Sequence, residues 1–324
     1  MKIVLALGGN ALLRRGEPQG AAQQLANIER AATQIALIAG AVPAHQLVIT
    51  HGNGPQVGLL ALQAAAYASM SDVPAYPLDV LGAETEGMVG YLLEQGLSNR
   101  LPGRTVATLI TRTEVSLADP AFRSPSKPIG PVYSADEAAR IAHERGWVMA
   151  AENAGAGKSV GMRRVVASPA PLRVLSVQAV EWLLSHGAIV IAAGGGGVPV
   201  ALRPASQGDV PSTGLNVLVG VEAVVDKDAT SSLLARSLGA ECLIIATDVP
   251  ALYLDFGLPT QRALHRVTTS ELARMHFAAG SMAPKVLSAC EFANATGARA
   301  VIGSLDDIDA MLRGDAGTQI WREG

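Results

Sequence analysis

The chain has 324 residues, of which 49% are hydrophobic and 16% charged, a composition that can bury a large core and excludes a disordered protein. The formal net charge is −3, and acidic and basic residues are interspersed, so we expect no nucleic acid partner. The stretch 31–71 carries no charged residue, but glutamine, histidine, asparagine and proline interrupt it, which argues against a membrane span.

Short apolar runs alternate with helical stretches along the chain, beginning with a strand predicted over 2–7. A helix is predicted over 21–39, where apolar residues recur at helical spacing: Leu25, Ile28, Ala32, Ile35 and Ala39. A second strand, over 46–50, leads to a helix that Pro55 opens. Further strands are expected at 105–110, 188–192, 242–246 and 299–302. This alternation predicts an α/β protein with a mostly parallel central sheet.

Two segments interrupt this alternation. Residues 119–169 are rich in proline, glycine, serine and arginine and contain only short strand-like pieces, which predicts an inserted lid subdomain. Residues 203–216 have turn composition and are expected to connect two lobes, 1–215 and 216–324.

Cysteine use and the start of the chain indicate a compartment. Cys242 and Cys290 have neither disulfide nor metal-ligand spacing, and the first strand follows Met1 with no leader before it. We therefore expect a cytoplasmic protein.

Three glycine-rich turns, at 8–10, 52–54 and 194–197, each follow a predicted strand. In a parallel sheet such turns lie at the carboxyl edge, where glycine lets backbone N–H groups approach an anion. Glycine also serves simply to make tight turns, but three turns in this position favour an oxyanion or phosphate site. Its expected residues are Gly8, Gly9, Asn10, Gly52, Asn53, Gly54, Gly194 and Gly195.

The chain has only five lysines against twenty arginines, and three of the lysines stand at informative places. Lys285 follows a proline at a predicted helix start, and Lys227 follows Asp226, the predicted N-cap of another helix. A cation in a first turn opposes the helix dipole, so both positions favour a bound anion over a solvated surface lysine. Lys127 lies between prolines in the predicted lid and could reach a reacting group when the lid closes.

Two glycine motifs resemble nucleotide-binding loops without matching them. The stretch AENAGAGKS at 151–159 ends like a Walker A loop, but Glu152 stands where that loop needs glycine. In HGNGPQVG at 51–58 the last glycine comes one residue too late for a dinucleotide fingerprint. Neither a P-loop nor an NAD site is favoured.

The chain resembles the carbamate kinases of the amino acid kinase superfamily in eight motifs that occur in the family's order. They are GGNAL at 8–12, HGNGPQVG at 51–58, SKPIGP at 126–131, RRVVASP at 163–169, GGGGVPV at 194–200, VDKD at 225–228, TDVPALY at 247–253 and GSMAPKV at 280–286. The resemblance extends from Lys2 to about Ile320. Two departures are Ala167, where many members have proline, and a longer lid segment before Arg163.

The resemblance implies a three-layer α/β/α sandwich, usually a homodimer, that transfers a phosphoryl group reversibly between ATP and carbamate. The products are ADP and carbamoyl phosphate, and carbamate itself decays to ammonia and carbon dioxide. The family uses Mg²⁺, which we expect the nucleotide phosphates to hold, with no metal ligand from the protein.

The resemblance also implies roles for individual residues. The 1–215 lobe would bind carbamoyl phosphate through the eight glycine-turn residues named above, and the 216–324 lobe would bind the nucleotide. The catalytic residues would be Lys127, Asp226, Lys227 and Lys285. The nucleotide side would comprise Lys227, Thr247, Asp248, Tyr253, Met282 and Lys285.

Two other functions remain open at this point. Another acyl-phosphate kinase of the same fold would typically carry a lysine before the first glycine pair, where this chain has Leu7. A non-catalytic metabolite sensor would keep the glycine turns and lose lysines, whereas all three lysines are present. The turns at 8–12 and 51–58 contain no arginine or lysine, which favours an acceptor as small as carbamate over one with a second carboxylate.

Overall fold

The computed structural model describes residues 1–12, 20–41, 44–53, 56–152, 161–205, 216–277 and 282–323. Gly54, Pro55 and most of the stretch that resembles a Walker A loop lie outside these residues. Among the described helices none combines the length and apolar character needed to cross a membrane.

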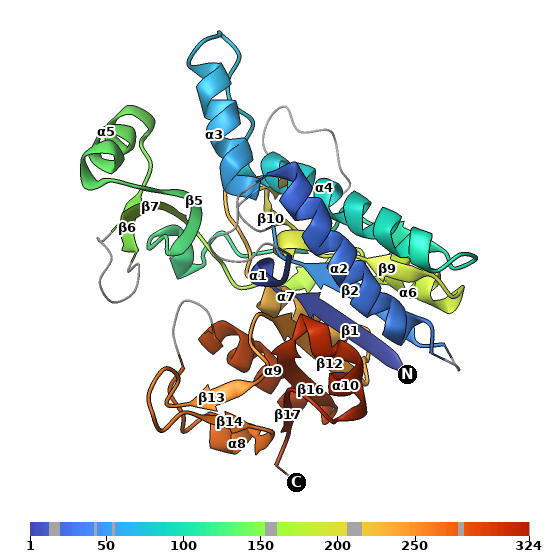
Figure 1. Cartoon of the computed structure of the whole chain (residues 1–324). Helices are drawn as coiled ribbons and strands as arrows, with labels where there is room; N and C mark the ends of the chain where they lie inside the picture. Colours follow the sequence, from blue (N-terminus) through green and yellow to red (C-terminus); the bar gives the residue numbers. More distant parts are fainter. Residues whose placement is uncertain are drawn as a thin grey trace.

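A large central sheet runs through the molecule (Figure 1). Its strands, in spatial order, are β15 (Arg266–Thr268), β17 (Thr318–Trp321), β16 (Arg299–Ser304), β12 (Cys242–Thr247), β1 (Lys2–Leu7), β2 (Gln46–His51), β9 (Ile189–Ile191) and β3 (Val106–Thr108). Neighbours pair in parallel except β16 and β17. The predicted mostly parallel sheet is therefore confirmed, and the expected strands are found with ends shifted by one or two residues.

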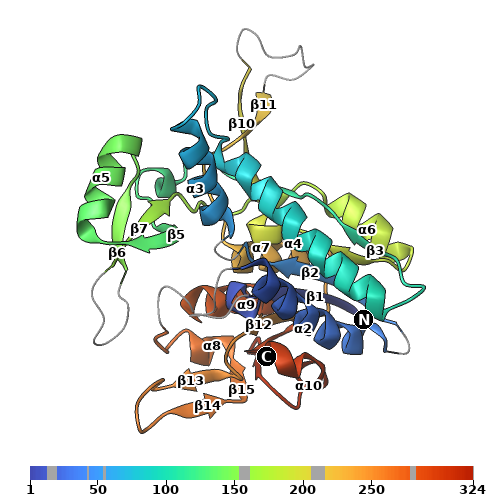
Figure 2. The same cartoon turned by 45° about the horizontal axis from the view of Figure 1, so that its top comes forward.

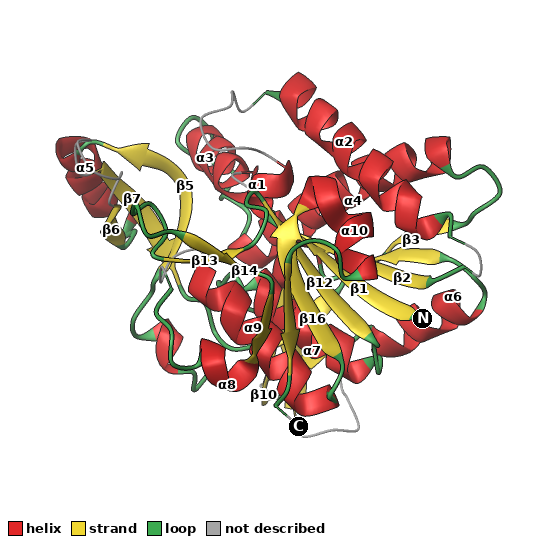
Figure 3. Ribbon diagram, turned by 60° about the horizontal axis from the view of Figure 1, so that its bottom comes forward, coloured by secondary structure: helices red, strands yellow, loops and turns green. Residues whose placement is uncertain are grey.

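Helices cover both faces of this sheet (Figure 3). The helices are α1 (Gly9–Leu12), α2 (Ala21–Ala39), α3 (Gln56–Ala68), α4 (Leu78–Arg100), α5 (Ala135–Arg145), α6 (Val177–Ser185), α7 (Lys227–Ser237), α8 (Thr269–Leu272), α9 (Met282–Thr296) and α10 (Ile308–Arg313). Short 3₁₀ helices are η1 (Pro120–Phe122), η2 (Gly194–Gly196) and η3 (Leu305–Asp307). One core packs the sheet against α2, α4 and α10, and a second packs it against α6, α7 and α9. The three-layer α/β/α arrangement is confirmed.

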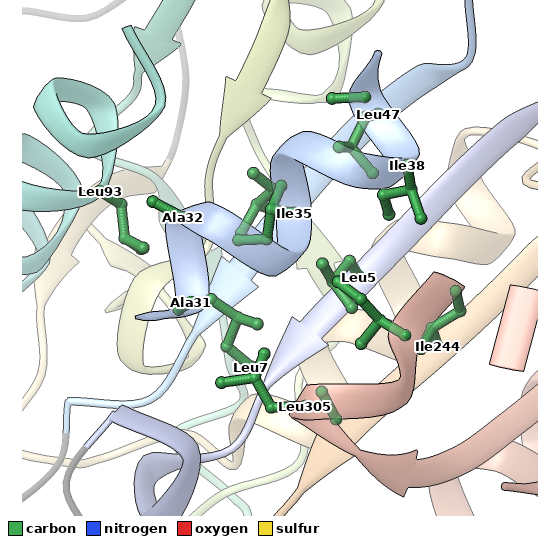
Figure 4. Close-up of a cluster of buried hydrophobic side chains, with 14 of the residues drawn as sticks. Leu5, Leu7, Ala31, Ala32, Ile35, Ile38, Leu47, Leu93, Ile244 and Leu305 are labelled. Atoms are coloured by element: carbon green, nitrogen blue, oxygen red, sulfur yellow. The ribbon is translucent and has the colours of Figure 1, made fainter. Parts of the chain in front are cut away.

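Helix α2 shows how the apolar pattern produces this packing (Figure 4). Ile28, Ala32, Ile35 and Ala39 are buried against β1 and α4, and each large aliphatic side chain contributes roughly 1.5–3 kcal/mol by leaving water. Leu25 was predicted on this face but is 47% exposed. It lies in the second turn of the helix, before the buried face begins at Asn27.

A smaller sheet has the order β11 (Asn216–Gly220), β10 (Val198–Pro204), β4 (Arg112–Glu114) and β8 (Arg173–Val174). In it, Pro204 pairs with Asn216 and Arg203 with Val217, both antiparallel. The two ends of the segment 203–216 therefore lie side by side in one sheet, while the division of the chain into lobes 1–215 and 216–324 stays a prediction. Another small sheet is formed by the antiparallel pair β13 (Leu252–Leu254) and β14 (Arg262–Leu264).

The segment 119–169 forms a separate body beside α3 (Figure 2). It contains the antiparallel sheet β5 (Lys127–Tyr133), β7 (Gly161–Val166) and β6 (Met149–Glu152), with α5 packed against it. It touches α3 so closely that a Cβ on Gly58 would lie 2.1 Å from the Cα and N of Gly130. We name this segment the lid; its motion stays a prediction.

Candidate active site

The three glycine turns follow β1, β2 and β9, and these strands are neighbours in the central sheet. The N–H of Gly52 donates to the carbonyl of Leu7 over 3.1 Å, which joins the first two turns. A Cβ on Gly52 would lie 3.1 Å from Gly9 and 3.2 Å from the Cδ of Lys227, so a larger residue here would crowd both the first turn and this lysine stem. The side chain of Asn10 and all of Gly54 lie outside the described part of the chain.

The third turn has a left-handed backbone that glycine makes possible. Ala193, Gly195, Gly196 and Gly197 all have positive φ, with Ala193 at 53° as the non-glycine exception. A Cβ on Gly195 would lie 1.8 Å from the Oδ1 of Asn53, so the Asn53 amide lies directly over this glycine. The structure therefore brings Asn53 together with Gly194 and Gly195, as a site at the carboxyl edge requires.

The backbone N–H groups of these turns are partly engaged within the protein. Gly8 donates to the carbonyl of Ala246, Gly52 to Leu7, and Gly194 to the carboxylate of Glu86. These three glycines therefore leave space for a bound anion, but their own N–H groups are already used. Hydrogen bonds to the anion must come from other groups of the same turns.

Asp226 connects the lid to helix α7. Its Oδ1 accepts from the backbone N–H groups of Asp228 and Ala229, so it is the N-cap of α7, as predicted. Its Oδ2 accepts from the Nζ of Lys127 at 2.6 Å. Asp226 thus directs the lid lysine toward the start of the helix that carries Lys227.

Asp228 holds the other two lysines. Its Oδ1 accepts from the Nζ of Lys227 at 2.5 Å, and its Oδ2 accepts from the Nζ of Lys285 at 2.9 Å. All three side chains are nearly buried, at 4%, 12% and 14% exposure respectively. The starts of α7 and α9 therefore present two ammonium groups fixed by a single carboxylate.

Charge pairing controls the protonation of this cluster. Burial by itself would raise the pKa of Asp228, but Lys227 and Lys285 lower it well below its usual value. The pKa of Asp226 is lowered in the same way by Lys127. Burial lowers the pKa of Lys227, and the carboxylate of Asp228 opposes that shift. With both aspartates ionised, three ammonium groups and two carboxylates leave one net positive charge for an anion.

The predicted nucleotide residues are spread more widely. Thr247 ends β12 next to Gly8, and its hydroxyl donates to Asp248 at 3.0 Å. Met282 begins α9, the helix that carries Lys285. Tyr253 lies on β13, where its ring is 5.9 Å from the ring of Phe256. Within the described residues, no hydrogen bond or cation–π contact joins Tyr253 to the three lysines.

Two carboxylates of this region were missed by sequence reasoning as site residues. Asp228 was noted only as the last residue of the VDKD motif, and its pairing with Lys285 joins residues 57 positions apart. Glu86 lies inside α4 without any motif, yet its carboxylate is 2.8 Å from the N–H of Gly194. No local pattern marks either contact.

A parallel sheet with glycine turns at its carboxyl edge and lysines at two helix starts defines a phosphotransferase of the amino acid kinase fold. The profile described as "Amino acid kinase family" matches residues 1–304. The chain is 51% identical over its whole length to the carbamate kinase of Haemophilus influenzae, covering 97% of that protein. It is 50% identical to the carbamate kinase of Rhizobium meliloti, over 99% of this chain and 93% of that one.

A solved structure agrees with the sequence comparisons. Carbamate kinase from Giardia lamblia bound to AMP-PNP superimposes with a TM-score of 0.84 at 37% identity, over 99% of this chain and 98% of that one. The chain belongs to the amino acid kinase family and, within it, to the carbamate kinases.

Proposed function

We propose that the protein catalyses the reversible reaction of carbamoyl phosphate and ADP to give ATP and carbamate. The observation that carries this proposal is the bridge from Asp228 to Lys227 and Lys285, set beside the turns at Gly8 and Gly52. Together with membership in the carbamate kinases, it supports transfer of a phosphoryl group at this edge of the sheet.

Positioning and charge neutralisation account for the chemistry. A transferring phosphoryl group spreads negative charge over its oxygens, and fixed cations stabilise that charge without reorganisation. We assign this work to Lys227 and Lys285, with Lys127 added from the lid. No general base is required, because the attacking carbamate oxygen is already anionic.

The two substrates enter from different sides in this proposal. Carbamoyl phosphate occupies the turns of the 1–215 half, which include Gly8, Gly52, Asn53 and Gly194. The nucleotide occupies the 216–324 half near Thr247 and Met282. Lys227 belongs to both sides, since its stem contacts Gly52 while its ammonium group lies at the start of α7.

Magnesium fits this site as a partner of the nucleotide. Both oxygens of Asp228 are paired with lysines, and Asp226 is used by Lys127 and by the α7 cap. The carboxylates of the cluster are therefore occupied, which leaves the metal to phosphate oxygens and water, the ligands that Mg²⁺ commonly takes in kinases. When bound, Mg²⁺ neutralises charge on the phosphates.

The surroundings of the acceptor turns favour a small acceptor. An acceptor with a second carboxylate needs a cation to pair it, because an unpaired buried charge is costly. His51 is the titratable side chain at the end of β2, and burial lowers its pKa to about 4, so it is neutral near pH 7. The turn residues thus provide no cation for a distal carboxylate.

The decisive assay measures ATP formation from carbamoyl phosphate and ADP, coupled to an ATP-dependent indicator reaction. We expect turnover in the wild type, and none in a metabolite sensor. In the reverse direction, carbamate, N-acetylglutamate and aspartate are compared at matched concentration with ATP and Mg²⁺. If either longer acceptor is phosphorylated as fast as carbamate, the protein is another acyl-phosphate kinase and the proposal is wrong.

The assembly and compartment are also proposals. We propose a homodimer, by analogy with the family, which light scattering coupled to size exclusion measures directly. Cys242 and Cys290 are free thiols, which fits the reducing cytoplasm.

A further inference from the structure

Glu86 is a buried carboxyl group that the proposed chemistry does not use. It lies in the third turn of α4 and is 1% exposed. Its Oε1 accepts from the N–H of Gly194 at 2.8 Å, and its Oε2 accepts from the N–H of Thr111 at 3.2 Å. Helix α4 is thereby tied to the turn after β9 and to the segment after β3.

The turn that Glu86 holds begins at a residue with an uncommon backbone conformation. Ala193 has a φ of 53°, in the left-handed region that a non-glycine residue keeps only where its surroundings favour it, whereas Gly195, Gly196 and Gly197 adopt positive φ without steric cost. The hydroxyl of Thr111 accepts from the N–H of Ala193 at 3.0 Å, one residue before the contact made by Glu86. Glu86 and Thr111 therefore constrain two successive peptide groups of the turn.

Packing carries this constraint to the acceptor side. A Cβ on Gly194 would lie 2.4 Å from the Nε2 of His51 and 2.8 Å from the Cγ of Glu86, so both side chains pack closely against this glycine. The next residue, Gly195, lies directly beneath the amide of Asn53. A shift of the turn would therefore move Asn53 as well.

The carboxyl of Glu86 has no compensating positive charge among the described residues around it. The groups that face it are Thr111 before β4, Gly194 in η2 and His51 at the end of β2. Of these, His51 titrates, and burial lowers its pKa to about 4. Burial raises the pKa of Glu86 to about 8, although the hydrogen bonds from Thr111 and Gly194 oppose that shift.

We propose that Glu86 is a positioning residue for the phosphoryl acceptor: it fixes the turn Ala193–Gly197 and, through Gly195, the Asn53 amide in the geometry that carbamoyl phosphate requires. This inference rests on the proposed assignment of Asn53, Gly194 and Gly195 to carbamoyl phosphate. Glu86 acts through these residues and does not itself touch the substrate.

The proposal separates the two substrates. The turn lies on the acceptor side, whereas the nucleotide residues Thr247 and Met282 belong to β12 and α9. Loss of the Glu86 contacts should therefore raise the KM for carbamoyl phosphate and leave the KM for ADP unchanged. An ionised carboxylate accepts hydrogen bonds more strongly than its acid, so the wild-type KM for carbamoyl phosphate should fall as the pH rises through about 8.

The test compares Glu86→Gln with Glu84→Gln, a control on the same helix whose side chain is exposed. The glutamine keeps the size of Glu86 but places an amide NH₂ against one of the two N–H donors. The rate of ATP formation is measured with carbamoyl phosphate and ADP varied separately, between pH 6.5 and 9.5. For Glu86→Gln we expect a KM for carbamoyl phosphate roughly tenfold higher than in the wild type and a KM for ADP within about twofold of the wild-type value. The change in the KM for carbamoyl phosphate that the wild type shows near pH 8 should be lost. Glu84→Gln should have the same two KM values and the same pH dependence as the wild type.

The possible results divide clearly. If the KM for carbamoyl phosphate is unchanged in Glu86→Gln, or if both KM values rise together, Glu86 is merely structural and the proposal is overturned. If circular dichroism shows that Glu86→Gln does not fold, the proposal is tested instead by the KM for carbamoyl phosphate of Thr111→Val and by the pH dependence of the wild-type KM. Thr111→Val removes the acceptor for Ala193, so it too should raise only the carbamoyl phosphate KM, and an unchanged value there or a flat wild-type profile rejects the inference. Absence of ATP formation by the wild type would instead reject the proposed function, and this inference with it.

Discussion

Lys227 has room for an ammonium group and for little more. Its stem passes 3.2 Å from the position of a Cβ on Gly52, and its Nζ lies 2.5 Å from Asp228. A guanidinium is larger and planar, so it cannot occupy the same point. We expect Lys227→Ala and Lys227→Arg each to lower kcat by roughly a hundredfold or more, the range for one preorganised partner of the transition state.

The control for this pair is Lys2→Arg, at the opposite end of β1, where Lys2 donates to the carbonyl of Leu238. Its turnover should match the wild type. Turnover of Lys227→Arg within tenfold of the wild type would show that the ammonium position is not critical.

Asp228 makes the stability of the fold depend on acid pH. Folding lowers its pKa below the value of 3.8 for the free side chain, so the native state binds this proton less readily than the unfolded state. The stabilisation is complete above about pH 5 and is lost as the pH falls below about 4. Asp228→Asn should unfold more easily than the wild type at pH 7, and the difference should shrink toward pH 3.

Urea unfolding at pH 7, 5, 4 and 3 measures this effect, with Asp72→Asn as an exposed control. A difference between Asp228→Asn and the wild type that stays constant across these pH values would contradict the prediction.

At the scale of residues, the sequence predicts features that depend on neighbouring positions, such as helix caps, and does not predict contacts between distant residues. The N-cap at Asp226 follows from its place before a helix, and the structure confirms it. The contacts of Asp228 with Lys285 and of Glu86 with Gly194 join residues 57 and 108 positions apart, so no spacing announces them. The exposure of Leu25 likewise depends on where the neighbouring layer ends.

At the scale of elements, the lid carries Lys127 and packs against the rest of the chain through Ile129 and Val166, which are buried beside Val57 and Ala61 of α3. Its described links include the ion pair of Lys127 with Asp226 and the approach of Gly130 to Gly58. We expect amide hydrogen exchange across 119–169 to be fast without ligand and slower with carbamoyl phosphate or nucleotide bound. Exchange in β12 should be slow in both states. Equal protection of the lid with and without ligands would identify it as a static subdomain.

The importance of the contact between α3 and β5 for activity can be tested by adding one methyl group to Gly58. Gly58→Ala would place its Cβ 2.1 Å from the backbone of Gly130, closer than real Cβ contacts allow, so the lid must shift. Lys127 lies three residues before Gly130 on β5, and small displacements of a catalytic group are costly. We expect kcat to fall roughly tenfold or more.

The matched control is Gly82→Ala in α4, where a Cβ meets nothing within 4 Å. That substitution should leave kcat unchanged and raise the free energy of unfolding by up to about 1 kcal/mol, the helix preference for alanine. If Gly58→Ala keeps full activity, the lid does not need this contact.

Elements of the layers were more predictable than those of the lid. The strand at 2–7 and the helix at 21–39 have the predicted bounds, because their apolar periodicity reflects burial in a layered sheet. The lid strands pair in antiparallel register, and the two prolines of β5 and the short length of β6 give no clear period.

At the scale of the whole molecule, the candidate site depends on both halves of the chain. Gly8 and Gly52 come from the first half, while Lys227 and Lys285 come from the second. The central strand β1 joins them, since it pairs with β2 on one side and with β12 on the other. The general position of the site at the carboxyl edge was predictable from strand order and glycine turns, but its charge balance was not.

The pairing of β1 with β12 also affects synthesis of the protein on the ribosome. Ile3 pairs with Cys242, so β1 leaves the ribosome long before the strand that completes its hydrogen bonds. At about 5–20 residues per second, the interval is on the order of 10–50 seconds. During that time one edge of a strand that is apolar from Ile3 to Leu7 has no partner, the condition in which strands pair with other chains. Newly made chains are therefore most prone to aggregation before residue 247 emerges, and slow release of the completed chain carries less risk than slow elongation through its middle.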